Sequence, residues 1–443
     1  MTRKTRAGAA LLSLAIAAGL TGCSASDDDA GGAVTLDYWL WDDNQKASYQ
    51  ACADAFTTAN PNIKIQITQS AWEQYWQNLT TQLAAGEAPD VWTNQGSYYP
   101  QFVSAGQILD IEPYVSADKV DLSQYQAGLA DLFTKDGKRY GLPKDWDTIA
   151  LVYNTDRLKA SDLADLTWNP QDGGTFEKLI AKATVDTSGR DGLDPAFDKS
   201  KVKTYGWLPE WGDGSQGQNG WGILAATTGF TYLDKNPWGT QYKYDDPALA
   251  QTIEWFKSLI AKGYSPPLDK SSTLSRDALL NAGKGAVTTA GSWMINSYLG
   301  DSAKAKFAFA PLPAGPQGRK TPINGLSDAI WAGTEHKDEA WKWVKFLASP
   351  ECQNIVGDNS VVFPAIKSAS ERSLAAHKAK GRDVQAFVDE AQAPGGTFFL
   401  PITEHGNEIS QIVQDSIQSS VLGQSDSATA LKKANEQVNA LFK

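Results

Sequence analysis

Cysteine and histidine are scarce in this chain, with three of each among 443 residues. His336, His377 and His405 lie far apart and lack the spacing of metal ligands, so we expect no metal site and no cofactor. The sequence also has no Walker A motif, no H-E-x-x-H zinc motif and no G-x-S-x-G nucleophile motif. These absences argue against several common classes of enzyme.

Positive charge is in deficit, with 40 Lys and Arg against 51 Asp and Glu and a formal net charge of −11. Nucleic acid is therefore not an expected partner, because binding to phosphates needs clustered Lys and Arg. After the first residues, no apolar run reaches the length that spans a bilayer. We expect the remaining body of about 410 residues to be soluble and to form two or three domains.

The first residues have the pattern of an export signal. Arg3, Lys4 and Arg6 precede an uncharged stretch at 7–20, which is too short to be an ordinary spanning helix. Leu20-Thr21-Gly22-Cys23 resembles the lipobox of bacterial lipoprotein signal peptides. We expect residues 1–22 to be removed, Cys23 to be lipidated, and residues 23–33 to form a flexible tether. The chain would then be anchored by lipid on the extracytoplasmic face of the cell membrane.

Cys52 and Cys352 are the only cysteines after Cys23. In an oxidising compartment they allow a single pairing, and the alternative is two buried free thiols. We expect a Cys52–Cys352 disulfide.

Residues 34–93 alternate between strand and helix patterns. The expected elements are a strand at 34–41, a helix at 45–58, a strand around Ile63, Ile65 and Ile67, a helix at 72–85 and a strand from 90 to 93. This βαβαβ order implies a parallel sheet, and such sheets bind ligands beyond the carboxyl ends of their strands. The residues expected at that edge are Trp41, Asp42 and Asp43 after one strand, and Asn94, Gln95 and Tyr98 after another.

Further along the chain, residues 140–147 suggest a Pro-containing turn that leads into a buried strand at 148–153. Residues 168–220 are rich in Gly, Asp, Asn, Pro and Trp, and we expect long loops there. Helices are expected again at 247–262, 338–348, 407–421 and 428–442.

Tryptophan is abundant, with 16 residues, and several lie beside Gly, Asp and Asn instead of in apolar runs. Most should pack in the core. A minority in loops at a cleft would offer flat faces for sugar rings, because the C–H face of a pyranose packs on an indole.

Over nearly its whole length the chain resembles the family 1 extracellular solute-binding proteins, the group that includes maltose-binding protein. The resemblance depends on the order and spacing of several segments, namely Trp39–Asn44, Trp72 with Tyr75, Leu83–Val91, Tyr140–Pro143, Ala150–Asn154, Gly283–Ala286, Gly291–Trp293, Pro311–Pro316, His336–Trp341 and Phe346–Glu351.

The resemblance implies a two-lobed α/β periplasmic-binding-protein fold (type II-like), in which each lobe has a mostly parallel sheet flanked by helices and three hinge crossings join the lobes. We expect the first lobe at 34–146 with 325–363 and the second at 147–324 with 364–443. The ligand would lie in the cleft between them.

Position by position, the resemblance implies a set of ligand contacts. They are Trp41 and Asp43 after the first strand, Asn94 and Ser97 with neighbouring Gln95 and Tyr98 after the third strand, Asp147 with Asp145 and Trp146 beside it at the first hinge, Trp293 as a stacking residue, and Asn324–Ser327, with Asn324 and Ser327 at its ends, at the second crossing. The candidates in the second lobe, where the sequence departs from the family, are Trp211, Asn219 and Trp221. Glu404, beside His405, is a further candidate for the cleft lining.

The function that the resemblance implies is capture of a neutral carbohydrate, an oligosaccharide, by a monomer that delivers it to the permease of an ABC importer. Two alternatives stay open. One is another solute, such as a polyamine, a peptide or glycerol phosphate, although a phosphate would need a cation that only Lys144 supplies in the expected site loops. The other is a secreted glycoside hydrolase, which needs two carboxylates such as Asp42, Asp43, Asp145, Asp147, Glu210 or Asp213. We expect no enzymatic activity.

Overall fold

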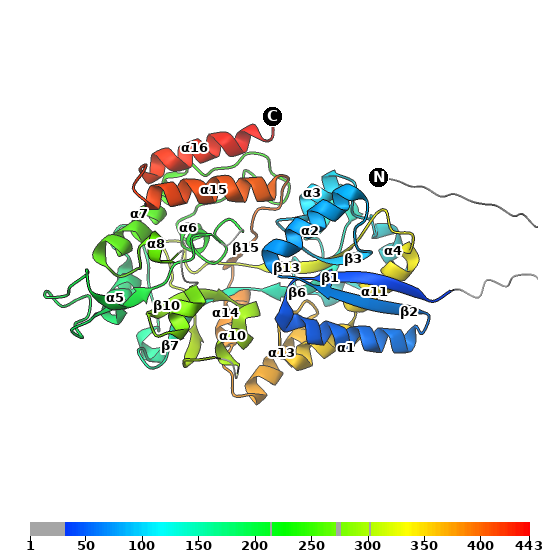
Figure 1. Ribbon diagram of the computed structural model, residues 1–443, viewed down its shortest axis with the longest axis horizontal. Helices are drawn as coiled ribbons and strands as arrows, with labels where there is room; N and C mark the ends of the chain where they lie inside the picture. Colours follow the sequence, from blue (N-terminus) through cyan, green and yellow to red (C-terminus); the bar gives the residue numbers. More distant parts are fainter. Residues whose placement is uncertain (1–31, 213–214, 272–275, 301–302) are drawn as a thin grey trace, which may run out of the picture.

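The computed structural model describes residues 32–212, 215–271, 276–300 and 303–443 (Figure 1). The expected signal peptide, the lipidation site Cys23 and the candidate carboxylate Asp213 lie outside these residues. Within the described part, no helix is both long enough and apolar enough to cross a bilayer.

The first lobe is built on a six-stranded sheet. Its strands, in spatial order, are β14 (Phe363–Pro364), β6 (Leu142–Asp147), β13 (Asn324–Ile330), β3 (Val91–Gln95), β1 (Val34–Leu40) and β2 (Ile63–Gln69). Its helices are α1 (Asp43–Ala59), α2 (Trp72–Ala85), α3 (Tyr99–Ser104), α4 (Glu112–Ala117), α11 (Lys337–Leu347), α12 (Pro350–Asn359) and α13 (Lys367–Ala379). A small hairpin, β4 (Thr134–Lys135) and β5 (Lys138–Arg139), lies beside them.

The expected βαβαβ unit is confirmed. Strands β1, β2 and β3 are parallel in the order β2-β1-β3, so α1 and α2 return in opposite directions and cover opposite faces of the sheet (Figure 1). Helix α1 begins at once after β1 because the Asp42 carboxylate caps it, accepting from the backbone N–H of Asn44 at 2.9 Å. Helix α2 ends at Gly86, whose φ of 74° is left-handed.

The second lobe has a five-stranded sheet in the order β11 (Phe307–Ala310), β7 (Ile149–Asn154), β10 (Gly285–Gly291), β9 (Val202–Trp207) and β8 (Val185–Asp186). The helices around it are α5 (Gly174–Ala183), α6 (Trp221–Ala226), α7 (Pro247–Lys262), α8 (Leu268–Ser271), α9 (Arg276–Asn281), α10 (Ile295–Leu299), α14 (Gln385–Gln392), α15 (Gly406–Val421) and α16 (Ser427–Ala440). The helices expected at 247–262, 338–348, 407–421 and 428–442 therefore form as α7, α11, α15 and α16.

Both sheets are mixed, which corrects the expectation of mostly parallel sheets. Strand β13 enters the first sheet between β3 and β6 and runs antiparallel to both. In the second sheet β7 is antiparallel to β10 and to β11, and only β9 and β10 are parallel. The reason is that strands which arrive from the other lobe, such as β7 and β13, enter against the direction of the local strands.

Two segments that we expected to be irregular contain regular structure. Residues 142–147 form strand β6 instead of a turn, and Pro143 is accommodated where the pairing with β13 shifts register between Leu326 and Ser327. Residues 168–220 include α5, β8 and β9 between their loops.

Three crossings join the lobes. Strand β6 of the first sheet continues through Thr148 into β7 of the second. The chain returns where β12 (Thr321–Pro322), which pairs with β15 (Thr397–Phe398), leads into β13. It crosses again between α13, which packs against α12 and β14, and α14, which packs against β7. The lobe limits given above stay a prediction. Helix α13 falls in the range 364–443 expected for the second lobe but lies beside the first sheet.

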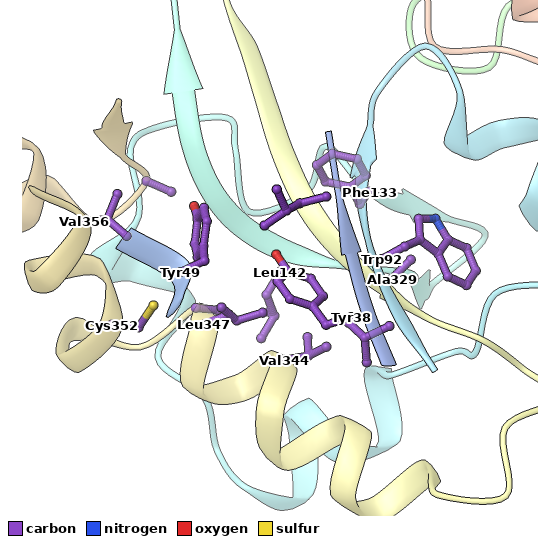
Figure 2. Packing of buried hydrophobic residues seen from close by; sticks show 14 of the residues in the cluster. Tyr38, Tyr49, Trp92, Phe133, Leu142, Ala329, Val344, Leu347, Cys352 and Val356 are labelled. Atoms are coloured by element: carbon purple, nitrogen blue, oxygen red, sulfur yellow. The ribbon is translucent and has the colours of Figure 1, made fainter. Parts of the chain in front are cut away.

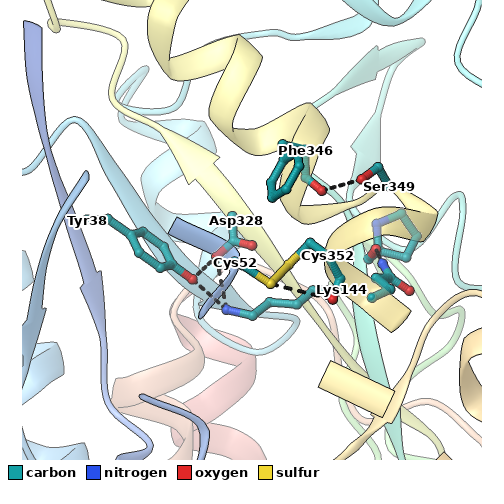
Figure 3. The surroundings of a disulfide bond; sticks show 9 residues. Tyr38, Cys52, Lys144, Asp328, Phe346, Ser349 and Cys352 are labelled. Atoms are coloured by element: carbon teal, nitrogen blue, oxygen red, sulfur yellow. Dashed lines mark hydrogen bonds and ion pairs between the residues drawn. A yellow bond between two sulfur atoms is a disulfide. The ribbon is translucent and has the colours of Figure 1, made fainter. Parts of the chain in front are cut away.

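Each lobe has its own apolar core. In the first, Tyr38, Leu142 and Val344 are buried where α11 packs on the sheet, and Trp92 is buried on the opposite face, against Phe102 of α3 (Figure 2). A disulfide between Cys52 of α1 and Cys352 of α12 joins two helices on the same side of this sheet (Figure 3). The structure thus forms the expected pair.

Candidate ligand-binding site

A cleft of about 320 Å³ lies between the lobes. Its lining comes from the end of β1 and the start of α1, from α2 and β3, from two of the three crossings, and from loops of the second lobe. The lining residues are Trp41, Asp42, Asp43, Asn44, Gln45, Trp72, Gln95, Asp147, Glu210, Ser215, Gln218, Asn219, Trp293, Met294, Asn324 and Leu326.

Aromatic rings form the wall on the first lobe. Trp41 follows β1 and meets Trp72, the first residue of α2, edge-to-face with 5.1 Å between ring centroids. One helical turn further, Trp76 lies 5.4 Å from Trp41 and stacks on Tyr98 at 3.9 Å. Trp41 and Trp72 line the cleft, whereas Trp76 and Tyr98 are buried behind them and hold them in place.

Polar groups gather at the carboxyl end of β1. The carboxylate of Asp42 accepts from the backbone N–H of Asn44 and from Nε2 of Gln45, at 2.9 and 2.8 Å, and it is therefore largely engaged. Asp43 lies in the first turn of α1 and its carboxylate makes no hydrogen bond or ion pair with the described residues. It is thus a free acceptor at the cleft wall.

The opposite wall belongs to the second lobe. Trp293 follows β10, and its indole folds back over Gly291, where a β-carbon would come within 2.1 Å of the ring. The loop before α6 is fixed to the same strand, because the Thr289 hydroxyl donates to the backbone carbonyl of Asn219. Glu210, also in the lining, pairs with the guanidinium of Arg276.

The floor of the cleft is formed by the crossings. Asp147, the last residue of β6, is only 4% exposed, and its Oδ1 accepts from the Ser292 hydroxyl at 2.7 Å. Its other carboxylate oxygen accepts no hydrogen bond from the described residues and lies on the cleft side. Burial raises the pKa of Asp147 to about 7, although the bond from Ser292 lowers it. Asn324 pairs with Asp147 across β6 and β13 and also lines the cleft.

The structure brings only part of the expected contact set to the cleft surface. Trp41, Asp43, Gln95, Asp147, Asn219, Trp293 and Asn324 line it. Asn94, Tyr98, Asp145 and Ser327 are buried just behind the lining. Asp145 accepts from the Leu326 N–H at 3.0 Å, and burial together with the charge of Asp147 raises its pKa well above the usual range.

The remaining expected residues lie elsewhere. Trp146 points away from the cleft and stacks on Phe363, with 4.8 Å between centroids. This follows from the alternation of a strand that places Asp145 and Asp147 on the other face. Trp211 and Trp221 are buried in the second lobe's core.

Glu404 lies at a different contact between the lobes. It pairs with Lys135 of the β4–β5 hairpin at 3.3 Å and accepts from the Ser104 hydroxyl at 2.5 Å.

Asp42 lines the cleft as expected of a residue at this edge of the sheet. Sequence reasoning left several other lining residues out of the expected contacts, namely Asn44, Gln45, Trp72, Glu210, Ser215, Gln218, Met294 and Leu326. Two of them carried a usable signal. Gln45 lies one turn into the helix that starts at the strand end, and Trp72 is one of the landmark residues of the family resemblance. Ser215 and Gln218 lie in a Gly-rich loop whose path is set by distant contacts, so the local sequence gave no signal.

The Lys144 ammonium is buried beneath the cleft and does not reach it. Its Nζ donates to Tyr38 Oη, Thr93 Oγ1 and Asp328 Oδ1 at 2.6, 2.7 and 3.1 Å (Figure 3). It also lies 3.9 Å from the ring centroid of Tyr49. All of its charge is thus used inside the first lobe, and it is not available for a phosphate ligand.

Two lobes joined by three crossings, with a cleft lined from both, define a two-lobed solute-binding protein. The family model of bacterial extracellular solute-binding proteins matches residues 51–386, and the chain belongs to this family.

Relatives at low identity agree with this assignment. The maltodextrin-binding protein MdxE of Bacillus subtilis (strain 168) is 26% identical over 346 residues, which cover 75% of this chain and 74% of the relative. The arabinooligosaccharide-binding protein of the same organism is 24% identical over 360 residues, covering 77% and 74%. The solved structure of the ABC substrate-binding protein Lmo0181 from Listeria monocytogenes, in complex with cycloalternan, matches with a TM-score of 0.77 at 21% identity, covering 92% and 98%. This structural match confirms the expected fold.

Proposed function

We propose that this chain is the substrate-binding component of an ABC importer and that it captures an oligosaccharide in the cleft between its lobes. The observation that carries the proposal is the pair of facing walls, with Trp41 and Trp72 on one lobe and Trp293 on the other. Indoles offer flat apolar faces to sugar rings, and the carboxylates and amides around them accept and donate hydrogen bonds to hydroxyls. The maltodextrin-binding and arabinooligosaccharide-binding names of two relatives support the same ligand class.

Binding should favour a closed arrangement of the lobes. A sugar that contacts both walls gains all of its interactions only when the lobes approach, and a ligand shifts a conformational balance by its differential affinity for the two states. The permease would recognise the closed form as loaded. We propose that the chain acts as a monomer and is held at the extracytoplasmic face of the membrane through lipid on Cys23.

A ligand screen tests the binding function. The mature protein is heated with a panel of mono- and oligosaccharides, and a ligand that binds only the native state raises the melting temperature by an amount that grows with ln(1 + [L]/Kd). Hits are titrated by calorimetry and then incubated for a long time to look for new reducing ends. Release of reducing ends would show a hydrolase instead of a binding protein. No stabilisation by any saccharide in the panel would contradict the proposal.

The anchor is tested separately. Replacing Cys23 by Ala should release the protein from the membrane fraction, because the lipid-bearing thiol is lost. Membrane attachment of the wild type with an unmodified Cys23 thiol would refute the lipid anchor and leave the binding function untouched.

A further inference from the structure

The described lining of the cleft combines carboxyl groups with indole faces and contains no Lys or Arg side chain. Four of the lining residues are acidic, namely Asp42, Asp43, Asp147 and Glu210, and none of the described lining residues is Lys or Arg. Arg276 neutralises Glu210, and Lys144 is bound to Asp328 beneath the sheet. The other three carboxyl groups have no Lys or Arg beside them in the described lining.

Asp147 points to a ligand independently of this count. Its side chain is 4% exposed, one carboxylate oxygen accepts only from Ser292, and the other has no partner among the described residues although it borders the cleft. Directly behind it, Oδ2 of Asp145 is buried without a hydrogen-bond partner. Two neighbouring carboxyl groups removed from water are costly in their charged form, and burial accordingly raises the pKa of both. An ammonium that reaches Asp147 would favour its charged form.

We infer, on the basis of the proposed sugar-binding function, that the saccharide carries a protonated amino group. The ammonium would lie between Asp43 and the free oxygen of Asp147, while its sugar rings lie between the indoles of Trp41 and Trp293. This replaces the neutral sugar that the sequence led us to expect.

An amino sugar suits the lining better than a metal ion or a bare polyamine. No group of three or more His, Cys, Asp and Glu residues in the described ranges is placed to hold a metal ion. A polyamine would use the carboxylates but would leave the amide groups of Gln95 and Asn324 in the lining without hydroxyl partners. Indole faces serve both parts of an amino sugar, since they stack on its C–H face and attract its cation.

The test compares matched sugars on the full mature chain at neutral pH. The probes are glucosamine, galactosamine and oligomers of β-1,4-linked glucosamine, each titrated beside its N-acetylated and its hydroxyl counterpart. We expect the amino form to bind about tenfold tighter or more, because a close unit charge in a partly buried site contributes more than 1.4 kcal/mol, the free energy of a tenfold change. Added salt should weaken the amino form more than the neutral forms.

Three variants place the effect in the cleft. Asp43→Asn and Asp147→Asn should each weaken binding of the amino form about tenfold more than they weaken binding of the neutral counterpart, so that the preference for the amino form falls. Asp54→Asn makes the same charge change on an exposed face of α1 outside the lining and should leave the preference unchanged. Because Asp43 is exposed at the helix start, its variant remains informative even if the buried Asp147 variant fails to fold.

Each outcome decides something different. Equal or tighter binding of the neutral sugars, or a preference that survives both cleft variants, overturns the amino-sugar inference and leaves the proposed function standing. Binding of spermidine with no sugar bound overturns both. Failure of all the sugars to bind also counts against both.

Discussion

The indole of Trp293 provides the sharpest test of the cleft as a sugar site. This residue follows β10 in the second lobe, lines the cleft opposite Trp41, and rests on Gly291. Replacing Trp293 by Ala removes a whole stacking face from one wall. Replacing it by Phe leaves a smaller face at the same place.

The expected loss follows from the area that a sugar ring covers. Covering about 60–80 Å² of indole at about 25 cal/mol per Å² contributes about 1.5–2 kcal/mol. The specific geometry of a ring on an aromatic face adds about 0.5–1.5 kcal/mol. Together these terms give about 2–3.5 kcal/mol, so the Kd of the Trp293→Ala variant should rise by about 30-fold to 400-fold. The Phe variant should lose less than half of this free energy.

Calorimetric titration with the tightest ligand of the saccharide screen measures both variants. Trp331 supplies the matched control, because it is also half-buried but lies at the end of β13, outside the cleft lining. Its Ala variant should bind the sugar as the wild type does.

Thermal unfolding separates a lost contact from a lost fold. Trp293 packs at the margin of both cores, so its Ala variant should unfold at a moderately lower temperature and still in one native-like transition. Unchanged sugar affinity in a folded Trp293→Ala variant would refute the assignment of this wall.

The first lobe could be predicted well because its signals are local. Alternating Ile63, Ile65 and Ile67 and the helical phase of 72–85 specify the βαβαβ unit without reference to the rest of the chain. The rule that ligands lie beyond the carboxyl ends of parallel strands then gave Trp41, Asp43 and Gln95 at the cleft.

Tryptophans in the second lobe could not be sorted from sequence, because their local surroundings are alike. Trp221 packs over Gly217 in the same way that Trp293 packs over Gly291. One lies in the core and the other in the cleft. The difference arises from contacts far apart in the sequence, such as the hydroxyl of Thr289 that fixes the loop at Asn219.

Strand β6 was missed for a related reason. Pro143 resembles a turn residue in isolation, and only the shifted pairing with β13 makes a strand possible there. Strand β6 also places Lys144 inside the lobe and Asp147 at the cleft. Because this strand was not predicted, the sequence did not distinguish the buried Lys144 from the cleft-lining Asp147.

Three further changes test the energetics. Burial raises the pKa of Asp147 from 3.8 to about 7, so the folded chain holds a proton that the unfolded chain releases, and stability falls as pH rises through this window. The Asp147→Asn variant should therefore melt at a higher temperature than the wild type at about pH 8 and not at about pH 4, and equal differences at both pH values would contradict the pKa shift. Lys144→Ala leaves Asp328 buried without its cation and should lower the free energy of unfolding by about 3–5 kcal/mol in urea titrations, whereas adding Asp328→Asn to it should restore part of the loss. The disulfide joins residues 300 positions apart, and its removal by Cys52→Ser should cost about 2–5 kcal/mol because the unfolded chain regains the freedom of a very long loop. Reduced wild type should match that variant in stability, and both should bind the sugar normally, since the bond links α1 to α12 outside the cleft lining. Two alkylatable thiols in the unreduced, denatured mature protein would show that the bond is not formed, and the stability loss expected for Cys52→Ser would then have no basis.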